Sequence, residues 1–243
     1  MAGPVAVLLA KQDHFQIPAL AKALGVFKNM PAPDATRLAR DTWGIVGENM
    51  TDDEGRALCA ELEKAGLAGK QILMSELAAL PAPTPATRWE WGTEADLIAV
   101  ASIETNTTKT IQIQEGPSGA QQLASLGIML ATGLPIGIGP KKKKVDKKVG
   151  SVDVQFYMDV YFGSPRRRAR IHAEKFDYNF LGERKLAGSY PNFRLLVKDV
   201  AAAAPSARRN KGAQILLDGK PVAMMGYETF DDLDRESRWL LSI

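Results

Sequence analysis

The chain has little of the chemistry from which most metal and cofactor sites are built. It contains a single cysteine, Cys59, so an internal disulfide and a cysteine-built metal site are both excluded. Its two histidines, His14 and His172, are too few for a histidine-rich metal centre. The sequence therefore predicts no metal and no cofactor, and the scarcity of cysteine favours a reducing location inside the cell.

Neither sign of charge is in strong excess. The 31 basic and 28 acidic side chains give a formal net charge of +3, and the basic residues are concentrated in local clusters. A dedicated nucleic-acid coat has a broad basic surface, so this balance argues against that class. No cationic segment precedes the short apolar stretch near the N-terminus, which predicts a first strand over residues 5–10 and a cytoplasmic protein.

The length and the apolar content allow one large domain or two small ones. The chain has 243 residues, of which 45% are hydrophobic, so a substantial core is expected. Three prolines at alternate positions, Pro81, Pro83 and Pro85, favour an extended connection. We predict a Pro-rich linker over residues 81–88, between domains of residues 1–80 and 89–243.

The N-terminal domain is predicted to be a small α/β sandwich with the order βααβαβ. Apolar strands are expected over residues 5–10, 43–46 and 72–74, and helices over 17–24, ended by Gly25, and 35–41, capped by Asp34. Thr51 and Glu54 have the spacing of a capping box, which opens a third helix.

Residues 49–55 (NMTDDEG) and 62–66 (LEKAG) carry a resemblance to a known family. With Asp34 opening the preceding helix, this segment resembles the C-terminal domain of the bacterial ribosomal stalk protein over about a third of the chain. The factor-binding face of that family is rich in lysine on its first helices, whereas Lys22, Lys28, Arg37 and Arg40 are the basic residues here. The resemblance implies a small docking domain, without implying that it binds translation factors.

The C-terminal domain is predicted to be an antiparallel sheet packed by helices, of the α+β class. Strand-like runs occur at 97–103 and 108–113, and residues 152–162 alternate strictly between apolar and polar side chains. That alternation predicts one core face and one solvent face, which carries Asp159 and Tyr161. A four-residue loop after Phe162 pairs Val160 with Ala169 and Asp159 with Arg170.

Three further elements are expected after this hairpin. Asn192 is a candidate cap for a helix whose apolar residues, from Phe193 to Ala204, recur on one face. Residues 215–222 predict a second hairpin with a tight turn at Asp218 and Gly219. Residues 229–241 predict a closing helix, and carboxylates at its start are typical of helix capping.

An apolar-then-basic insertion at residues 116–148 is the most unusual part of the sequence. The apolar segment, residues 116–140, has 25 consecutive uncharged residues, and the lysine block, residues 141–148, follows it. Glycines and prolines interrupt the apolar segment, which disfavours a spanning helix. The apolar candidates for contact are Leu126, Ile128, Met129, Leu130, Leu134, Ile136 and Ile138, and the basic candidates are Lys141, Lys142, Lys143, Lys144, Lys147 and Lys148.

Two interpretations of this insertion stay open. In one, the apolar segment is buried on the protein itself or in a partner, and the lysines lie on a solvated loop. In the other, the segment inserts shallowly into an anionic membrane surface and each lysine near it adds on the order of 1 kcal/mol.

Residues 166–170 form a second basic group, the arginine cluster. Arg166, Arg167, Arg168 and Arg170 are candidates for binding phosphate or acidic head groups. In the alternative, Arg168 and Arg170 pair across the strands with Asp159 or stack on tyrosine.

A third group, His172, Glu174 and Tyr157, is a conceivable acid/base set. A structural role is the competing interpretation, because the sequence shows no nucleophile or oxyanion hole beside it. No catalytic residue is therefore assigned.

These features predict a non-enzymatic intracellular adaptor or assembly subunit. Its apolar segment and basic clusters would contact a protein partner, another copy of the chain, or an anionic membrane surface at which the protein is peripheral. One alternative is a nucleic-acid or ribosome-associated binding protein, whose affinity would fall steeply with salt. A second alternative is an enzyme of unknown class centred on His172.

Overall fold

A computed structural model describes residues 3–12, 16–88, 94–115 and 143–243. They belong to two compact units: unit 1, of residues 1–104 and 154–243, and unit 2, of residues 105–153. The fold combines helices and strands, as the sequence predicts for both halves of the chain.

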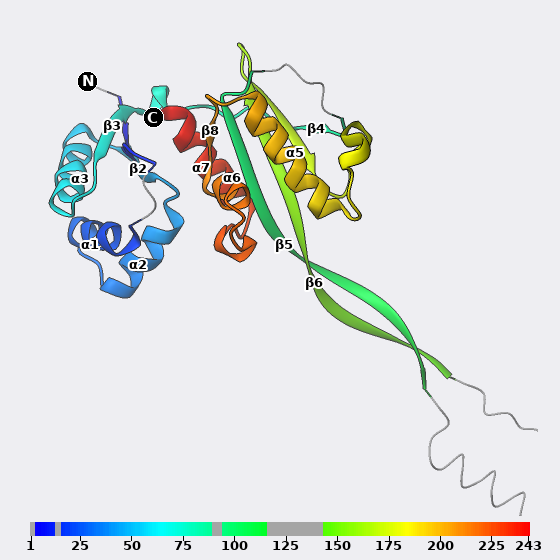
Figure 1. The fold of residues 1–243 in the computed structure, drawn as a ribbon. Coiled ribbons are helices and arrows are strands. Elements are labelled where there is room, and N and C mark those ends of the chain that lie inside the picture. Colours follow the sequence, from blue (N-terminus) through cyan, green and yellow to red (C-terminus); the bar gives the residue numbers. More distant parts are fainter. Residues whose placement is uncertain (1–2, 13–15, 89–93, 116–142) are drawn as a thin grey trace, which may run out of the picture. The chain divides into compact units, whose positions relative to one another are not determined.

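The first sheet of unit 1 is antiparallel and has the strand order β2-β1-β3. The predicted order βααβαβ is confirmed, and helices α1 and α3 pack beside each other next to this sheet (Figure 1). The elements are β1 (Val5–Leu9), α1 (Ile17–Lys28), α2 (Ala32–Asp41), β2 (Ile45–Met50), α3 (Asp52–Lys64) and β3 (Gly69–Leu73), followed by a 3-10 turn at Met74–Glu76.

The helices predicted in this region are present, but some of them begin or end at other residues than predicted. Thr51 and Glu54 form both bonds of the capping box at the start of α3. Two predicted boundaries are wrong. Helix α1 continues through Gly25 and ends at Lys28, where Asn29 caps it with a left-handed backbone. Helix α2 begins at Ala32, so that Asp34 lies inside its first turn.

The second sheet of unit 1 is mixed, with the strand order β4-β7-β6-β5-β8. Strand β6 pairs antiparallel with β7, as predicted, and helices pack on the sheet. The short strands β4 and β8 add parallel pairs with β7 and β5, so the sheet is mixed. Its strands are β4 (Thr84–Ala86), β5 (Leu97–Glu115), β6 (Lys143–Phe162), β7 (Arg167–His172) and β8 (Arg208–Arg209). The predicted runs 97–103 and 108–113 are parts of one strand, β5.

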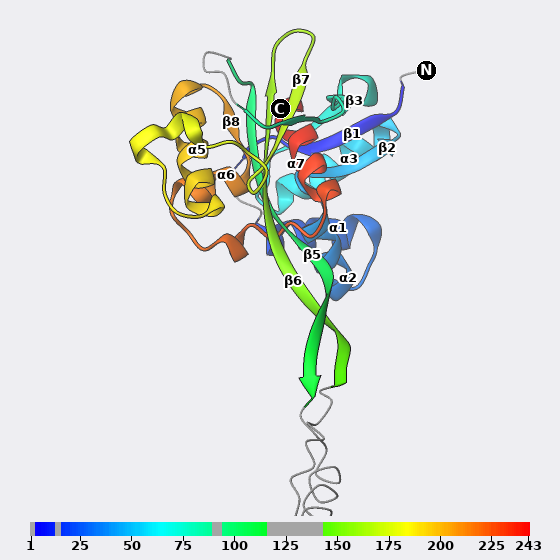
Figure 2. The same cartoon turned by 90° about the vertical axis from the view of Figure 1, so that its right-hand side faces the viewer.

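The register predicted for the β6–β7 hairpin is confirmed. Val160 pairs with Ala169 and Asp159 pairs with Arg170. The prediction of one solvent-exposed face is wrong, because Asp159 and Tyr161 are both 0% exposed. Helix α5 covers one face of the sheet and helix α7 covers the other, and Figure 2 shows them on opposite sides of β5 and β6.

The helices of this half begin and end differently from the sequence prediction in two places. Helix α5 (Ser189–Ala203) starts before Asn192, which lies inside it and bonds back to Leu186 and Gly188. Residues 215–222 do not form a hairpin: residues 215–217 are the last turn of α6 (Lys211–Leu217), and Gly219, with a φ of 73°, follows its C-cap. The closing helix is confirmed as α7 (Phe230–Ser242), capped by Thr229, and 3-10 turns lie at Asn179–Arg184 and Val222–Met224.

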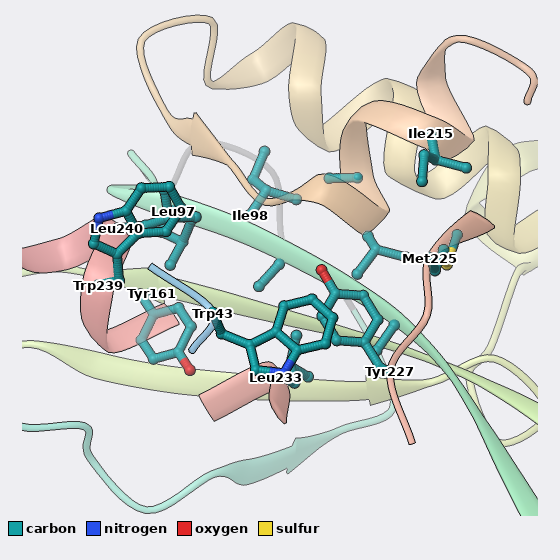
Figure 3. Packing of buried hydrophobic residues seen from close by; sticks show 14 of the residues in the cluster. Trp43, Leu97, Ile98, Tyr161, Ile215, Met225, Tyr227, Leu233, Trp239 and Leu240 are labelled. Atoms are coloured by element: carbon teal, nitrogen blue, oxygen red, sulfur yellow. The ribbon is translucent and has the colours of Figure 1, made fainter. Parts of the chain in front are cut away.

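Helix α7 links the two sheets of unit 1. Its Trp239 donates a hydrogen bond to the carbonyl of Leu9 in β1 at 2.7 Å, and its Arg235 donates to the carbonyl of Thr42 at 3.0 Å. Gly44, with a φ of 88°, lies so close to Trp239 that a Cβ there would overlap the indole ring. The buried apolar side chains of both halves form a single cluster, part of which is shown in Figure 3. The predicted linker supplies β4, and the domain boundary at 81–88 stays a prediction.

We expect Gly212→Ala in α6 to destabilise unit 1 strongly, because a Cβ at this position would overlap the carbonyl oxygen of Val100 in β5. Overpacking against backbone typically costs about 1–3 kcal/mol. The matched control is Gly25→Ala in α1, where the Cβ would lie 3.4 Å from that of Ala35, an ordinary contact. A helix-interior alanine stabilises by about 0.5–1 kcal/mol relative to glycine, so the two variants should move the midpoint of urea unfolding in opposite directions.

Candidate functional site

The arginine cluster is divided between surface and interior. Arg166 and Arg167 are exposed, and Arg166 lies 3.6 Å from a carboxylate oxygen of Asp96. Arg168 is 3% exposed, and Arg170 is partly buried. The structure therefore does not present the four arginines as one continuous basic surface.

Arg168 and Arg170 enclose the buried carboxylate of Asp159. Arg168 donates from Nε to Asp159 at 3.0 Å, and Arg170 donates from Nε at 2.8 Å. Asp234 of α7 also accepts a bond from Arg168. Burial alone would lower the pKa of Arg168, but Asp234 and Asp159 outweigh that effect and raise it. The guanidinium of Arg168 lies 5.3 Å from the ring of Tyr161, so both predicted strand contacts, with Asp159 and with tyrosine, are present.

The lysine block and the apolar segment fall largely on unit 2 or outside the described residues. Lys143, Lys144, Lys147 and Lys148 lie in β6. The predicted contact residues outside the described part of the chain are Lys141, Lys142, Leu126, Ile128, Met129, Leu130, Leu134, Ile136 and Ile138.

His172 lies within packed side chains on the sheet. Its Nε2 is 3.2 Å from Gln155 Oε1, and its ring is 4.8 Å from that of Tyr157. The hydroxyl of Tyr157 also donates to Gln155, and Glu174 is exposed. Burial and the charge of Lys175 lower the pKa of His172. One cleft, described below, lies beside Glu236, and further hollows lie along α1, α3 and α6. Within the described residues, His172 lines none of these four.

The carboxylates of α7 have three different roles. Asp232 accepts hydrogen bonds from the backbone of Glu228 and Thr229, as helix capping predicts. Asp234 pairs with Arg168, and Glu236 is 1% exposed in the interior. Capping therefore accounts for the first of these residues but not for the other two.

A cleft of about 460 Å³ lies next to Glu236, and sequence analysis did not identify it. It is formed where the loop before α1, the end of α2 and the turn after it meet α6 and α7. Figure 3 shows two of its neighbours, Trp43 and Tyr227, whose rings stack at 4.7 Å. The lining residues are Gln12, Ile17, Arg40, Asp41, Trp43, Lys211, Gln214, Gly226, Glu228, Asp232, Glu236 and Trp239.

Glu236 is held by a buried network behind the cleft. It accepts a short hydrogen bond from the hydroxyl of Tyr227 and one of 3.0 Å from the backbone N–H of Lys211. Asn210 donates to the Tyr227 hydroxyl at 2.8 Å and accepts from the backbone N–H of Val100 in β5 at the same distance. Burial raises the pKa of Glu236, although the hydrogen bond from Tyr227 opposes the change.

Within the described part of the chain, no group of three or more histidine, cysteine or carboxylate side chains is arranged to hold a metal ion. Over the same residues, no helix combines the length and apolar character needed to cross a membrane.

Comparison with family models, with curated proteins and with solved structures finds no match to this chain. The resemblance to the ribosomal stalk domain stays a prediction, and the residues themselves carry the functional argument.

We expect Asp159→Asn to destabilise the fold by about 3–5 kcal/mol, because it removes the fully buried counter-charge of Arg168 and Arg170 and leaves them only the partly exposed Asp234. The control is Asp199→Asn, which removes a pair with the largely exposed Arg184 and should cost at most about 1 kcal/mol. Denaturant unfolding followed by circular dichroism measures both. Equal losses in the two variants would contradict a special role for the buried network.

Glu236 should make the stability of the fold depend on pH. Because its pKa is higher in the folded protein than in the unfolded chain, the folded state binds the proton more tightly. The ionised carboxylate therefore destabilises the fold at neutral pH. This effect is lost as the pH falls from the raised pKa of the folded protein towards about 4.3, the ordinary pKa of glutamate. Wild-type protein should gain stability relative to Glu236→Gln over that interval, measured by unfolding at each pH. Parallel pH profiles would show that Glu236 does not titrate in this way.

Proposed function

We propose that the protein is a non-enzymatic intracellular adaptor or assembly subunit that docks to a protein partner through unit 2. The observation that carries this proposal is the make-up of that unit. Its described residues, 105–115 and 143–153, all belong to strands β5 and β6. A sheet of two strands is marginally stable in water and gains stability from further strands or from packing on another surface.

The sequence of unit 2 supports contact with another molecule. It joins the 25 uncharged residues of the apolar segment to a total of seven lysines, with three carboxylates. Large apolar stretches rimmed by charge are typical of interaction sites. Because the unit carries a net positive charge, it favours a partner whose docking surface is apolar with an acidic margin.

The nucleic-acid alternative has less support from the geometry. It relies on the arginine cluster together with the lysine block, but Arg168 and Arg170 are already paired with Asp159. The catalytic alternative centred on His172 also has less support, because Gln155 and the ring of Tyr157 already contact the imidazole and the clefts described above are lined by other residues.

Deletion of unit 2 tests the proposal. Thr105 Oγ1 donates to the carbonyl of Asp153 at 3.0 Å, so the two strands are adjacent there. Residues 106–152 can therefore be replaced by Asn-Gly, which favours a two-residue hairpin turn. We expect the deletion variant to keep the melting temperature of unit 1 and to sediment as a monomer. The full chain should form larger species, or cross-link through its unit 2 lysines to another protein in the cells that make it.

The membrane-surface interpretation is an outcome of the same experiment. Flotation of the full chain with anionic vesicles, lost on changing Lys141, Lys142, Lys143 and Lys144 to Gln, would assign unit 2 to head groups instead of protein. If the full chain and the deletion variant sediment identically, and unit 2 lysines form no intermolecular cross-links and no vesicle contacts, the adaptor role is wrong.

A further inference from the structure

Strand β5 has an edge that no described strand covers over most of its length. Its neighbours in the sheet are β6 and β8, and among the described residues β8 pairs with Leu97 and Ile98 alone. Further along, the Asn210 side chain bonds to both the N–H and the C=O of Val100 and closes the edge there. No described strand borders residues 105–115, the part of β5 in unit 2, on this side.

The pleat of β5 determines which of its backbone groups point out from this edge. In a regular strand, the N–H and C=O groups of alternate residues point to the same side. Val100 points outward, as its two bonds to Asn210 show, and the outward carbonyl of Ile98 accepts from the N–H of Asn210. The even-numbered residues of β5, Gln112 among them, therefore offer their backbone groups to a further strand.

The two strands of unit 2 differ in how strongly their charges oppose such pairing. Residues 143–153 of β6 include four lysines and two aspartates, and lysine on an edge strand is a common guard against pairing with another chain. Residues 105–115 of β5 (TNTTKTIQIQE) carry one charge of each sign, Lys109 and Glu115. Six of these eleven residues are β-branched and none is glycine or proline, which favours a strand. The edge of β5 is thus the better suited to an added strand.

The sequence of this edge is complementary to itself. In an antiparallel pair of identical strands, a two-fold axis relates the two copies, and a residue on the axis lies opposite its own copy. With Gln112 on the axis, Lys109 lies opposite Glu115 of the second copy, twice per dimer, and Ile111 lies opposite Ile113. Opposite charges directly across two strands stabilise the pair, whereas like charges destabilise it. No other register in β5 opposes these two charges.

The lysines of unit 2 do not oppose this arrangement strongly. Pairing through β5 gives the strand order β6-β5-β5-β6, in which the two copies of β6 are the outermost strands. Neighbouring strands lie about 4.8 Å apart, so the two copies of β6 are separated by about 14 Å. That separation exceeds the Debye length of about 8 Å at physiological salt, so the repulsion between their lysines is largely screened.

We infer that residues 109–115 of β5 pair antiparallel with the same residues of a second copy of the chain, in the register that places Gln112 opposite itself. The inference goes beyond the adaptor role, because it assigns dimerisation to β5 and leaves the lysine-rich strand β6 to a partner with an acidic margin. The two claims can fail separately, since changes in β5 leave those lysines in place.

Sedimentation equilibrium of the full chain at physiological salt tests the charge pairs. The wild-type chain should dimerise as its concentration rises. Lys109→Glu or Glu115→Lys alone opposes like charges twice per dimer, and should raise the dissociation constant about tenfold. The double variant restores opposite charges, and should return the constant to within about threefold of wild type. Lys148→Glu in β6 makes the same change in net charge as Lys109→Glu, and should alter the constant by less than about twofold.

A cysteine at the two-fold axis tests the register. Opposed residues of a hydrogen-bonded pair have Cα atoms about 5.5 Å apart, which is within reach of a disulfide. With Cys59 changed to Ser, Gln112→Cys should therefore form an intermolecular disulfide under mild oxidation. The matched control is Thr108→Cys, whose two copies would lie about 27 Å apart in this register and should not cross-link.

The inference is overturned if the full chain stays monomeric up to about 0.5 mM, a result that leaves the adaptor role to be judged by cross-linking to another protein. It is also overturned if the double variant dissociates as readily as either single variant, or if Gln112→Cys and Thr108→Cys cross-link equally. Misfolding does not explain a recovery in the double variant, because that chain contains both changes.

Discussion

The buried ion network around Asp159 is the constraint on which the arrangement of unit 1 depends. A fully buried carboxylate is costly unless it is paired and hydrogen-bonded, and here two arginines of β7 supply both. Those arginines bring an excess of positive charge, which Asp234 of α7 balances. Helix α7 must therefore lie on this face of the sheet, and its opposite side then reaches Leu9 of β1 through Trp239.

Local patterns predicted much of the fold. The capping box at Thr51 and the register of the β6–β7 hairpin depend on neighbours in sequence, and both are confirmed. The Asp218-Gly219 pair was misassigned because a glycine with positive φ serves a hairpin turn and a helix end equally well. The alternation in β6 identified the two faces correctly, but it cannot separate a face in water from one covered by a matching layer of charge.

The cleft was not predictable in the same way. It combines residues from both ends of the chain, such as Trp43 and Lys211, and no spacing along the sequence relates them. The sequence pattern of carboxylates at the start of α7 includes Glu236. Helix capping was a sufficient explanation for that pattern, so nothing in the sequence indicated that Glu236 is buried. The hydrogen bonds from the Tyr227 hydroxyl and the Lys211 N–H show why an acid lies in the interior of this helix face.

The proline-containing strand β4 has a consequence for how the second sheet meets other molecules. It lies at one end of the strand order, and Pro85 has no N–H to offer to a further strand. At the other end, β8 is two residues long, too short to template an added strand. Beside these two short strands the sheet is thus poorly suited to strand addition, and short or proline-containing edge strands are one way in which natural sheets avoid uncontrolled aggregation. At these two positions, contacts with other molecules are left to side chains.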